Sequence, residues 1–199
     1  MRELIVTQNI TLDGVIDAAE GWFEPSGEEG TDQSEVIEAV REGMATTDAL
    51  LFGRVTFEQM RGFWPQQTDD VTGVRDHLNE AHKYVLSRTL QDPAWERSAV
   101  LRGPLLEEVR KLKAQPGKGI VATGSVSLMP ELIAGGVVDE YRLFVYPVVL
   151  GRGRRLFADA TSVPRLRLAE TRPFRSGIVL LRYRTARDRG EPVGTERGN

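Results

Sequence analysis

The sequence predicts an α/β sandwich with a mainly parallel central sheet and antiparallel strands at its C-terminal side. Short apolar runs of β type alternate with helical patterns up to about residue 137. Strands that are joined through helices pair in parallel by right-handed crossovers. The last three apolar runs follow one another with no helical pattern between them, so we expect these strands to be antiparallel at the sheet edge.

The predicted strands are short runs rich in apolar residues and bounded by turn residues. They are Leu4–Thr7, Ala49–Phe52, Tyr84–Leu86, Ala99–Leu101, Ile120–Ala122, Tyr141–Val149, Leu166–Ala169 and Ile178–Tyr183.

The first predicted helix, Ser34–Met44, places Val36, Ile37 and Val40 on one face and its glutamates toward water. Capping residues and helix-terminating Pro and Gly residues predict three further helices. They are Val55–Phe63, Leu105–Ala114 with Pro104 at its first position, and a helix capped by Ser125 or Ser127 that runs through Ile133 to Gly135-Gly136.

Length and composition predict one domain over residues 1–185. The chain has 199 residues, 40% of them hydrophobic, and a net charge of −3, which is sufficient for a sizeable core. Residues 186–199 are polar, Gly-rich and aperiodic, so we expect a disordered tail. Residues 14–30 are expected to form a long mobile loop that contains Trp22 and Phe23.

The absence of cysteine excludes a disulfide scaffold, a thiolate zinc site and a cysteine nucleophile. The chain has only two histidines, His77 and His82, so we expect no metal site. The longest apolar run, Leu143–Leu150, is far shorter than the roughly 20 residues that span a membrane. Since the N-terminus also lacks a signal segment, we expect a cytoplasmic protein with no membrane partner.

The C-terminal quarter is basic, with 12 basic and 5 acidic side chains in residues 150–199. A basic end is one sign of a nucleic-acid binder. However, Arg165, Arg167, Arg182 and Arg184 alternate with apolar residues, as on the solvated face of a half-buried strand, and interleaved aromatic residues are missing. We therefore expect no nucleic-acid partner.

Polar and glycine residues follow three predicted strands, at the edge where open α/β sheets bind ligands. Each end offers groups suited to an anion: glycine, free N–H groups at a helix start, hydroxyls or a guanidinium. The residues are Gly53, Arg54 and Thr56 after the second strand, Ser87 and Arg88 after the third, and Thr123, Gly124 and Ser125 after the fifth. Each set alone fits an ordinary turn, whereas three sets in one sheet indicate a ligand that carries several phosphates.

Six segments, taken in order, resemble the dihydrofolate reductase superfamily, and most closely the reductase domain of the bacterial riboflavin-biosynthesis deaminase-reductase. The resemblance runs from about residue 2 to 183 and depends on the ordered set rather than on one motif. The segments are residues 9–14 (Asn-Ile-Thr-Leu-Asp-Gly), 53–58 (Gly-Arg-Val-Thr-Phe-Glu), 86–88 (Leu-Ser-Arg), 123–128 (Thr-Gly-Ser-Val-Ser-Leu), 138–141 (Val-Asp-Glu-Tyr) and 147–153 (Pro-Val-Val-Leu-Gly-Arg-Gly).

This resemblance implies a three-layer, dihydrofolate-reductase-like sandwich that binds NADPH. It implies that Gly53, Arg54 and Thr56 hold cofactor phosphates, that Ser87 and Arg88 lie by the adenosine 2′-phosphate, and that Thr123, Gly124 and Ser125 hold the pyrophosphate. Asp13 and Gly14 would lie where the first loop meets the nicotinamide and the substrate.

Two departures from the family pattern concern the substrate. Riboflavin-pathway reductases usually have a glutamate just before the glycine of the third motif and a serine in the first, where this chain has Thr123 and Asn9. Dihydrofolate reductases have an acidic residue on the first long helix that pairs with the pteridine. Here Asp32, Glu35 and Glu38 are near, but Glu35 and Glu38 fall on the solvent face.

The leading hypothesis is an NADPH-dependent reductase of a small heterocyclic or carbonyl substrate. Asp13 is the candidate catalytic residue, for substrate orientation or proton supply, although Asp13-Gly14 also fits a simple turn pair. Asn9, Trp22, Phe23 and Trp64 are the candidate substrate-pocket residues, and the aromatic ones fit core or dimer packing equally well. The alternative is a non-catalytic nucleotide-binding or regulatory module on the same fold.

A homodimer is expected from the nearly continuous apolar strand Leu143–Tyr146. Its outward-facing half needs cover from a helix or from a second subunit.

Overall fold

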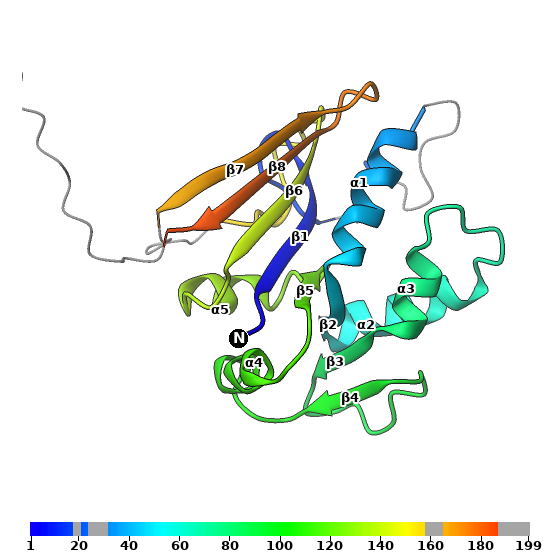
Figure 1. Ribbon diagram of the computed structural model, residues 1–199, viewed down its shortest axis with the longest axis vertical. Helices are drawn as coiled ribbons and strands as arrows, with labels where there is room; N and C mark the ends of the chain where they lie inside the picture. Colours follow the sequence, from blue (N-terminus) through cyan, green and yellow to red (C-terminus); the bar gives the residue numbers. More distant parts are fainter. Residues whose placement is uncertain (18–20, 24–31, 158–164, 187–199) are drawn as a thin grey trace, which may run out of the picture.

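A computed structural model describes residues 1–17, 21–23, 32–157 and 165–186 of the chain. Its centre is an eight-stranded sheet with the order β4-β3-β2-β5-β1-β6-β8-β7 (Figure 1). The strands are β1 (Leu4–Thr11), β2 (Thr47–Gly53), β3 (His82–Leu86), β4 (Ser98–Leu101), β5 (Gly119–Thr123), β6 (Glu140–Tyr146), β7 (Leu166–Pro173) and β8 (Val179–Thr185).

The six strands from β4 to β6 pair in parallel, and β8 runs antiparallel to both β6 and β7. This arrangement confirms the predicted mainly parallel sheet with antiparallel C-terminal strands. The helices that connect the parallel strands lie on both of its faces, which makes the predicted three layers.

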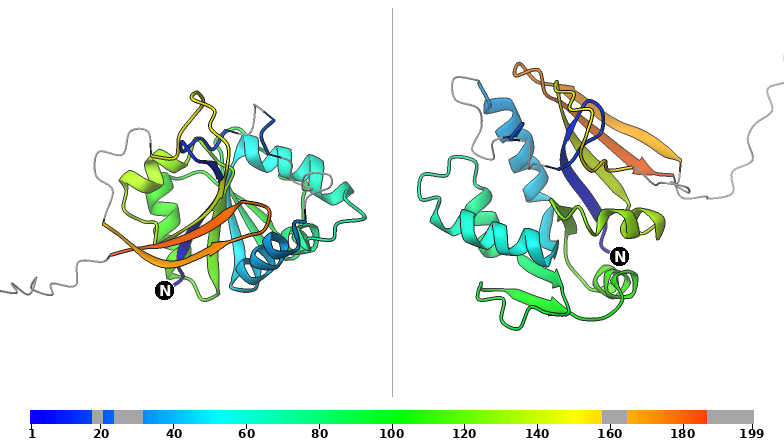
Figure 2. Two further views of the ribbon diagram at one scale, coloured as in Figure 1. Left: turned by 90° about the horizontal axis from the view of Figure 1, so that it is seen from above. Right: turned by 180° about the vertical axis from the view of Figure 1, so that it is seen from behind.

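Helices α4 and α5 cover one face of the sheet, and α1, α2 and α3 cover the other (Figure 2). The first group packs on Leu4, Val6 and Ala122, while the second packs on Phe52, Val85 and Phe144. The helices are α1 (Ser34–Ala45), α2 (Arg54–Phe63), α3 (Val74–Glu80), α4 (Leu105–Ala114) and α5 (Met129–Ala134), with a 3-10 turn, η2 (Trp64–Gln66), after α2.

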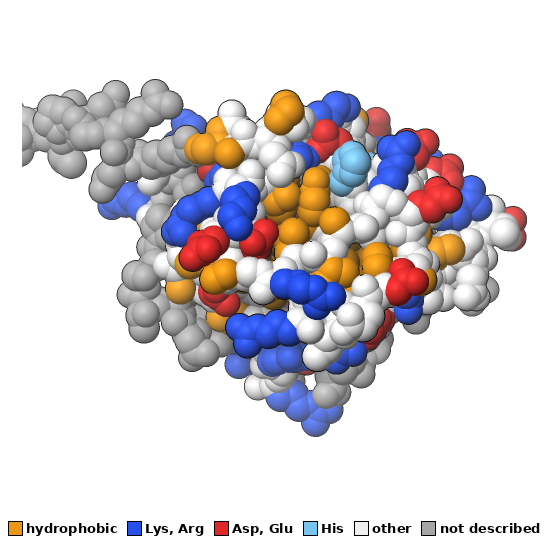
Figure 3. Space-filling view, turned by 90° about the horizontal axis from the view of Figure 1, so that it is seen from below, with side chains coloured by type: hydrophobic (Ala, Val, Ile, Leu, Met, Phe, Trp, Pro, Cys, Tyr) orange, Lys and Arg blue, Asp and Glu red, His pale blue; other side chains and the backbone are white. Residues whose placement is uncertain are grey.

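Helices α4 and α5 leave the β3–β4 end of their face only partly covered. Tyr84, Leu86, Leu101 and Leu106 are half-buried there at the margin of the core. Figure 3 shows the molecule from below, where apolar side chains gather in the middle of the face and charged side chains surround them.

Several element boundaries differ from the prediction, and two of these differences have local reasons. Strand β1 continues to Thr11 because it keeps pairing with β6 after β5 has ended. Strand β6 ends at Tyr146, since Pro147 follows and has no N–H with which to extend the ladder. Helix α3 was not predicted: it is only seven residues long, and its start is fixed by side-chain turns of Asp70 and Thr72.

The predicted serine cap of α5 was wrong. The helix begins at Met129 with Leu128 in the N-cap position, and no side chain caps it. The Ser125 hydroxyl instead accepts a hydrogen bond from the Gly53 amide and so links the end of β2 to the turn after β5. Pro104 likewise occupies the N-cap position of α4 rather than its first turn.

Strand β6 is covered from within the chain. Leu143 lies in the core under α4 and α5, whereas Phe144 packs with Ala39 of α1. Helix α1 therefore covers the apolar strand face from which a second subunit was inferred. The homodimer stays a prediction. All of the predicted tail after Ala186 and most of the predicted mobile loop lie outside the described residues.

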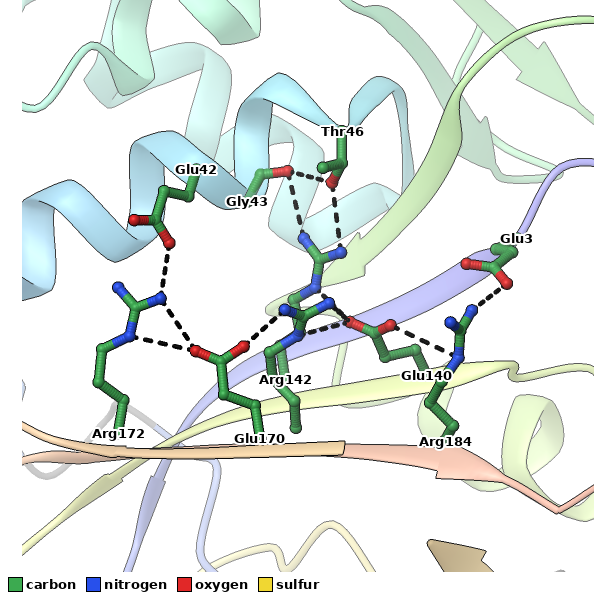
Figure 4. A network of polar contacts seen from close by, with 10 residues as sticks. Glu3, Glu42, Gly43, Thr46, Glu140, Arg142, Glu170, Arg172 and Arg184 are labelled. Carbon is green, nitrogen blue, oxygen red and sulfur yellow. Dashed lines mark hydrogen bonds and ion pairs between the residues drawn. The ribbon is translucent and has the colours of Figure 1, made fainter. Parts of the chain in front are cut away.

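A network of charged side chains fixes α1 to the antiparallel end of the sheet (Figure 4). Glu140, which is almost fully buried, pairs with Arg142 at 2.6 Å and with Arg182 at 3.0 Å. Arg142 also donates to the Gly43 carbonyl and the Thr46 hydroxyl at the end of α1. Buried charges of this kind depend on one another, because removal of one leaves its partner without compensation.

The free energy of unfolding is expected to depend far more on the buried centre of this network than on its rim. Glu140→Ala leaves the buried Arg142 guanidinium without its counter-charge, which should cost about 3–5 kcal/mol. Glu42→Ala removes the half-exposed partner of Arg172 and should cost less than about 1 kcal/mol. Urea unfolding of both variants measures the difference, and equal losses would contradict this account of the network.

Candidate functional site

The carboxyl ends of the parallel strands place the predicted cofactor residues along one edge of the sheet. Gly53 pairs with Leu86, directly before Ser87, and Thr7 of β1 pairs with Thr123 of β5. The three polar strand ends therefore follow one another across β3, β2 and β5. Asp13 and Gly14 follow at the end of β1, the next strand of the sheet.

Two hydrogen bonds join the ends of β2 and β5. The Gly53 amide donates to the Ser125 hydroxyl at 2.9 Å, and the Thr56 hydroxyl donates to the Gly124 carbonyl at 3.0 Å. Ser125 is 1% exposed, so its contact is shielded from water. These bonds hold the turn after β5 against the start of α2.

Gly124 is required by the geometry of this turn. Its φ is +61°, in the left-handed region that favours glycine, and an added Cβ would lie 2.9 Å from the Thr56 methyl group. The turn thus places main chain without a side chain at the sheet edge. A phosphate can approach the N–H groups of such a turn closely.

The N-terminus of α2 begins at this point and has no side-chain cap. The first N–H groups of a helix have no partner within the helix and attract anions. Arg54 stands in the first turn, and its exposed guanidinium contacts only Glu58 among the described side chains, at 3.1 Å. Residues of α2 and of the Gly124 turn therefore form a corner rich in backbone N–H groups, with the Arg54 guanidinium exposed beside it.

Ser87 and Arg88 have different roles at the end of β3. The Ser87 hydroxyl accepts hydrogen bonds from the Thr89 and Leu90 amides and so shapes the turn, whereas the Arg88 side chain is exposed. Arg102 was missed by the sequence analysis. It follows β4 directly and donates to the Arg88 and Leu90 carbonyls, which braces the same turn. The position of Arg102 directly after a predicted strand was the sequence signal by which it could have been found.

The Asp13 carboxylate binds the loop that follows β6. It accepts hydrogen bonds from the Thr11 hydroxyl at 2.6 Å and from the amides of Leu150 and Gly151, and it pairs with Arg155 at 3.3 Å. The hydrogen bond from Thr11, followed by those from the loop amides, lowers the pKa of Asp13 to about 2. An ionised carboxylate with these contacts suits the positioning role and has no proton to supply at neutral pH.

Gly14 continues this turn with a φ of +87°. Its amide donates to the Thr11 carbonyl, and its carbonyl accepts from the Leu156 amide. Asp13 and Gly14 therefore form the turn pair that the sequence analysis gave as the alternative, and they anchor the 147–156 loop beside the end of β1.

The candidate pocket aromatics separate into two places. Trp22 and Phe23 lie against Tyr146, at the end of β6, with ring centroids 5.4 and 5.7 Å from the tyrosine ring. Asn9 is half-buried on β1, where it pairs with Phe144, two residues before the Thr11–Tyr146 pair. Trp64 is instead part of the core between α2 and the sheet, where its indole N–H contacts the Met60 sulfur.

Among the described residues, no three His, Cys, Asp or Glu side chains gather in a way that could hold a metal ion. Within the same ranges, no helix is long and apolar enough to cross a membrane.

We expect the Gly124 turn to tolerate no side chain. Gly124→Ala should cost about 1–2 kcal/mol through its left-handed backbone alone, before Thr56 has to move. Gly62→Ala is the matched control, because that helical glycine has open space around it and alanine favours a helix by about 0.5–1 kcal/mol. Thermal unfolding distinguishes the two, and equal stability of both variants would refute the requirement for glycine.

The Asp13 carboxyl is expected to titrate at about pH 2. A depressed pKa means that its stabilising contribution is complete above the ordinary value of 3.8 and is lost as the pH falls toward 2. The carboxyl ¹³C chemical shift, assigned by comparison with Asp13→Asn, measures the midpoint. A midpoint at 3.8 or above would show that the Thr11 and loop contacts are absent in solution.

The chain matches the family model of the RibD C-terminal domain over residues 2–180. Among curated proteins it is similar to the uncharacterized protein YyaP of Bacillus subtilis, with 35% identity over 188 residues that cover 92% of this chain and 94% of YyaP. The uncharacterized protein YwjB of the same organism is 25% identical over 185 residues, with 90% and 96% coverage.

Solved structures share the fold at lower identity. A putative riboflavin biosynthesis protein from Shewanella sp. PV-4 has a TM-score of 0.68 and 19% identity, with 93% of this chain and 99% of that chain covered. A deaminase/5-amino-6-(5-phosphoribosylamino)uracil reductase from Thermotoga maritima has a TM-score of 0.62 and 19% identity, with 93% and 57% covered. The fold is that of RibD-type reductases, and the match over residues 2–180 shows that the chain belongs to the RibD C-terminal domain family.

Proposed function

We propose that this protein is an NADPH-dependent reductase of a small heterocyclic or carbonyl substrate. The observation that carries the proposal is the corner formed by the Gly124 turn, the uncapped start of α2 and the exposed Arg54. Arg88 lies at the end of the neighbouring strand β3. Membership of the RibD C-terminal domain family supports a reductase of this type.

The chain's own residues fit the phosphates of NADPH. Gly124 and Ser125, together with the first N–H groups of α2, would hold the pyrophosphate because bare backbone and a helix start both favour anions. Arg54 and Arg88 would reach the 2′-phosphate, for which a planar guanidinium is well suited. NADPH, when bound, supplies the hydride, and the protein contributes orientation and electrostatics.

The substrate would lie beyond the end of β1, beside Asn9 and the aromatic cluster of Trp22, Phe23 and Tyr146. Asp13 would act there as a positioning residue, since its carboxylate holds the 147–156 loop next to β1. Trp64 has no place in this assignment because it belongs to the core under α2.

A second candidate function is that of a nucleotide-binding or regulatory module that catalyses no reaction. It is favoured by one observation: Thr123 occupies the position before Gly124 where riboflavin-pathway reductases usually have a glutamate. NADPH oxidation in the presence of pterins, pyrimidines or quinones would establish the reductase. Cofactor binding without oxidation of NADPH by any of these would favour the module.

Removal of either arginine is expected to weaken NADPH binding about 10- to 100-fold. A charge-assisted hydrogen bond contributes roughly 1.5–3 kcal/mol, and about 1.4 kcal/mol is a factor of ten. Arg88→Ala should leave NADH binding nearly unchanged, because NADH lacks the 2′-phosphate. Arg54→Ala should weaken both cofactors if Arg54 also contacts the pyrophosphate.

Fluorescence titration at one fixed ionic strength measures these affinities. Arg110→Ala, an exposed arginine of α4, serves as the charge-matched control and should bind NADPH as the unmodified protein does. Equal affinity of the unmodified protein for NADPH and NADH, or unchanged NADPH affinity in both variants, would show that the arginine assignment is wrong.

A further inference from the structure

Three carboxylates, from Asp32 just before α1 and from Glu35 and Glu42 within it, bind arginines of the β7–β8 hairpin, whereas Glu38 of α1 is exposed. Glu35 accepts a hydrogen bond from the Arg175 amide at 2.8 Å and pairs with its guanidinium, and Asp32 pairs with the same arginine. Glu42, seven residues after Glu35 and so on the same side of the helix, pairs with Arg172. These carboxylates hold α1 in place and are not available to recognise a cationic substrate ring.

An uncharged polar row lies on the helix α1 face of the sheet, at the carboxyl ends of its central strands. Thr7 and Asn9 point to the same face of β1, because side chains two apart in a strand share a face. Thr123 is in register with Thr7 on the neighbouring strand. All three are half-buried, and none forms a side-chain hydrogen bond with another residue in the part of the chain that the structure describes.

On β6, the neighbours of this row are apolar or neutralised. Phe144 pairs with Asn9, and Arg142 pairs with Thr7. The Arg142 guanidinium is already bound by Glu140, by the Gly43 carbonyl and by the Thr46 hydroxyl. A ligand charge placed against this row would thus lose its hydration without gaining a free counter-charge from these side chains.

Aromatic side chains extend the same face at the end of β6. Tyr146 shares it with Phe144, and Trp22 and Phe23 lie edge-on to the Tyr146 ring. Aromatic walls next to a few neutral hydrogen-bonding groups are typical of sites for small planar ligands.

We propose that the substrate is an uncharged ring compound bearing carbonyl groups, which binds to Thr7, Asn9 and Thr123 beside the Trp22–Phe23–Tyr146 cluster. The amide N–H of Asn9 and the threonine hydroxyls donate to the carbonyl oxygens. This inference rests on the proposed reductase function and narrows its substrate class: a protonated pteridine or an anionic ring would be disfavoured.

The reaction balances with the proposed cofactor and water alone. A carbonyl group takes up the hydride of NADPH at carbon and a proton from solvent at oxygen, so that its π bond is replaced by C–H and O–H bonds. NADPH is oxidised to NADP⁺ by the loss of two electrons. For a quinone, the same two electrons and two hydrogens give the hydroquinone.

The first test compares two matched probes, 1,4-naphthoquinone and 1,4-naphthoquinone-2-sulfonate, after the Kd of NADPH has been measured. The ring is the same, and the sulfonate makes it a better hydride acceptor, yet we expect kcat/KM to be at least 10-fold higher for the neutral quinone. Rates without protein are subtracted. An equal or higher value for the sulfonate, or turnover of dihydrofolate but not of the neutral quinone, would overturn the inference while leaving the reductase proposal intact.

The second test changes the polar row. Asn9→Leu and Thr7→Val should each lower kcat/KM for the neutral quinone about 3- to 10-fold, as expected for one neutral hydrogen bond, and leave the Kd of NADPH within 2-fold. Thr171→Val, on an exposed position of β7, is the matched control. Unchanged kcat/KM in both row variants would contradict the assignment of the row. Failure of the unmodified protein to bind NADPH would instead refute the proposed function from which the inference starts.

Discussion

The buried hydrogen bond from the Gly53 amide to the Ser125 hydroxyl is the contact on which the candidate site depends. It joins the ends of two neighbouring parallel strands, β2 and β5. Without it, a buried N–H group would lose its partner, at a cost of about 1–3 kcal/mol. The bond also fixes how the start of α2 faces the Gly124 turn, and this relation gives the corner its concentration of N–H groups.

The parallel sheet supplies what this contact needs. Parallel pairing of β3, β2, β5, β1 and β6 places the carboxyl ends of these strands on one edge, so that residues far apart in sequence become neighbours. The antiparallel end of the sheet has a different task. There, Glu140 and its arginines fix α1 across the strands, and the glutamates of α1 pair with the hairpin arginines. The parallel half of the sheet thus carries the candidate site, and the antiparallel half carries the network of charged side chains.

Much of the fold could be predicted from the sequence because its signals are local. Alternation of apolar runs and helical patterns gave the parallel strands, and the missing helices after residue 140 gave the antiparallel ones. The cap of α5 could not be predicted, since the Ser125 hydroxyl has two competing partners and the choice depends on a strand 72 residues away. Helix α3 escaped detection because side-chain turns, and not an apolar period, start it.

The positions of the candidate site residues were predictable where they lie at or directly after a strand end, as for Gly53, Arg54, Arg88 and Gly124. Their roles were not predictable where a side chain acts through long-range contacts. The sequence allowed Asp13 to be a proton donor. Its partners Leu150, Gly151 and Arg155, which fix its role in the turn, come from a loop 137 or more residues later. Trp64 was similarly a candidate pocket residue in the sequence, but in the structure it packs in the core beside α2.

The central claim is that the corner between α2 and the Gly124 turn binds NADPH phosphates. A crystal structure of the protein with NADP⁺ tests it most directly. The account predicts the pyrophosphate against the Gly124–Ser125 backbone and the first turn of α2, with the 2′-phosphate within hydrogen-bond distance of Arg88 or Arg54. A cofactor bound elsewhere on the chain, or a 2′-phosphate that points away from both arginines into solvent, would contradict it.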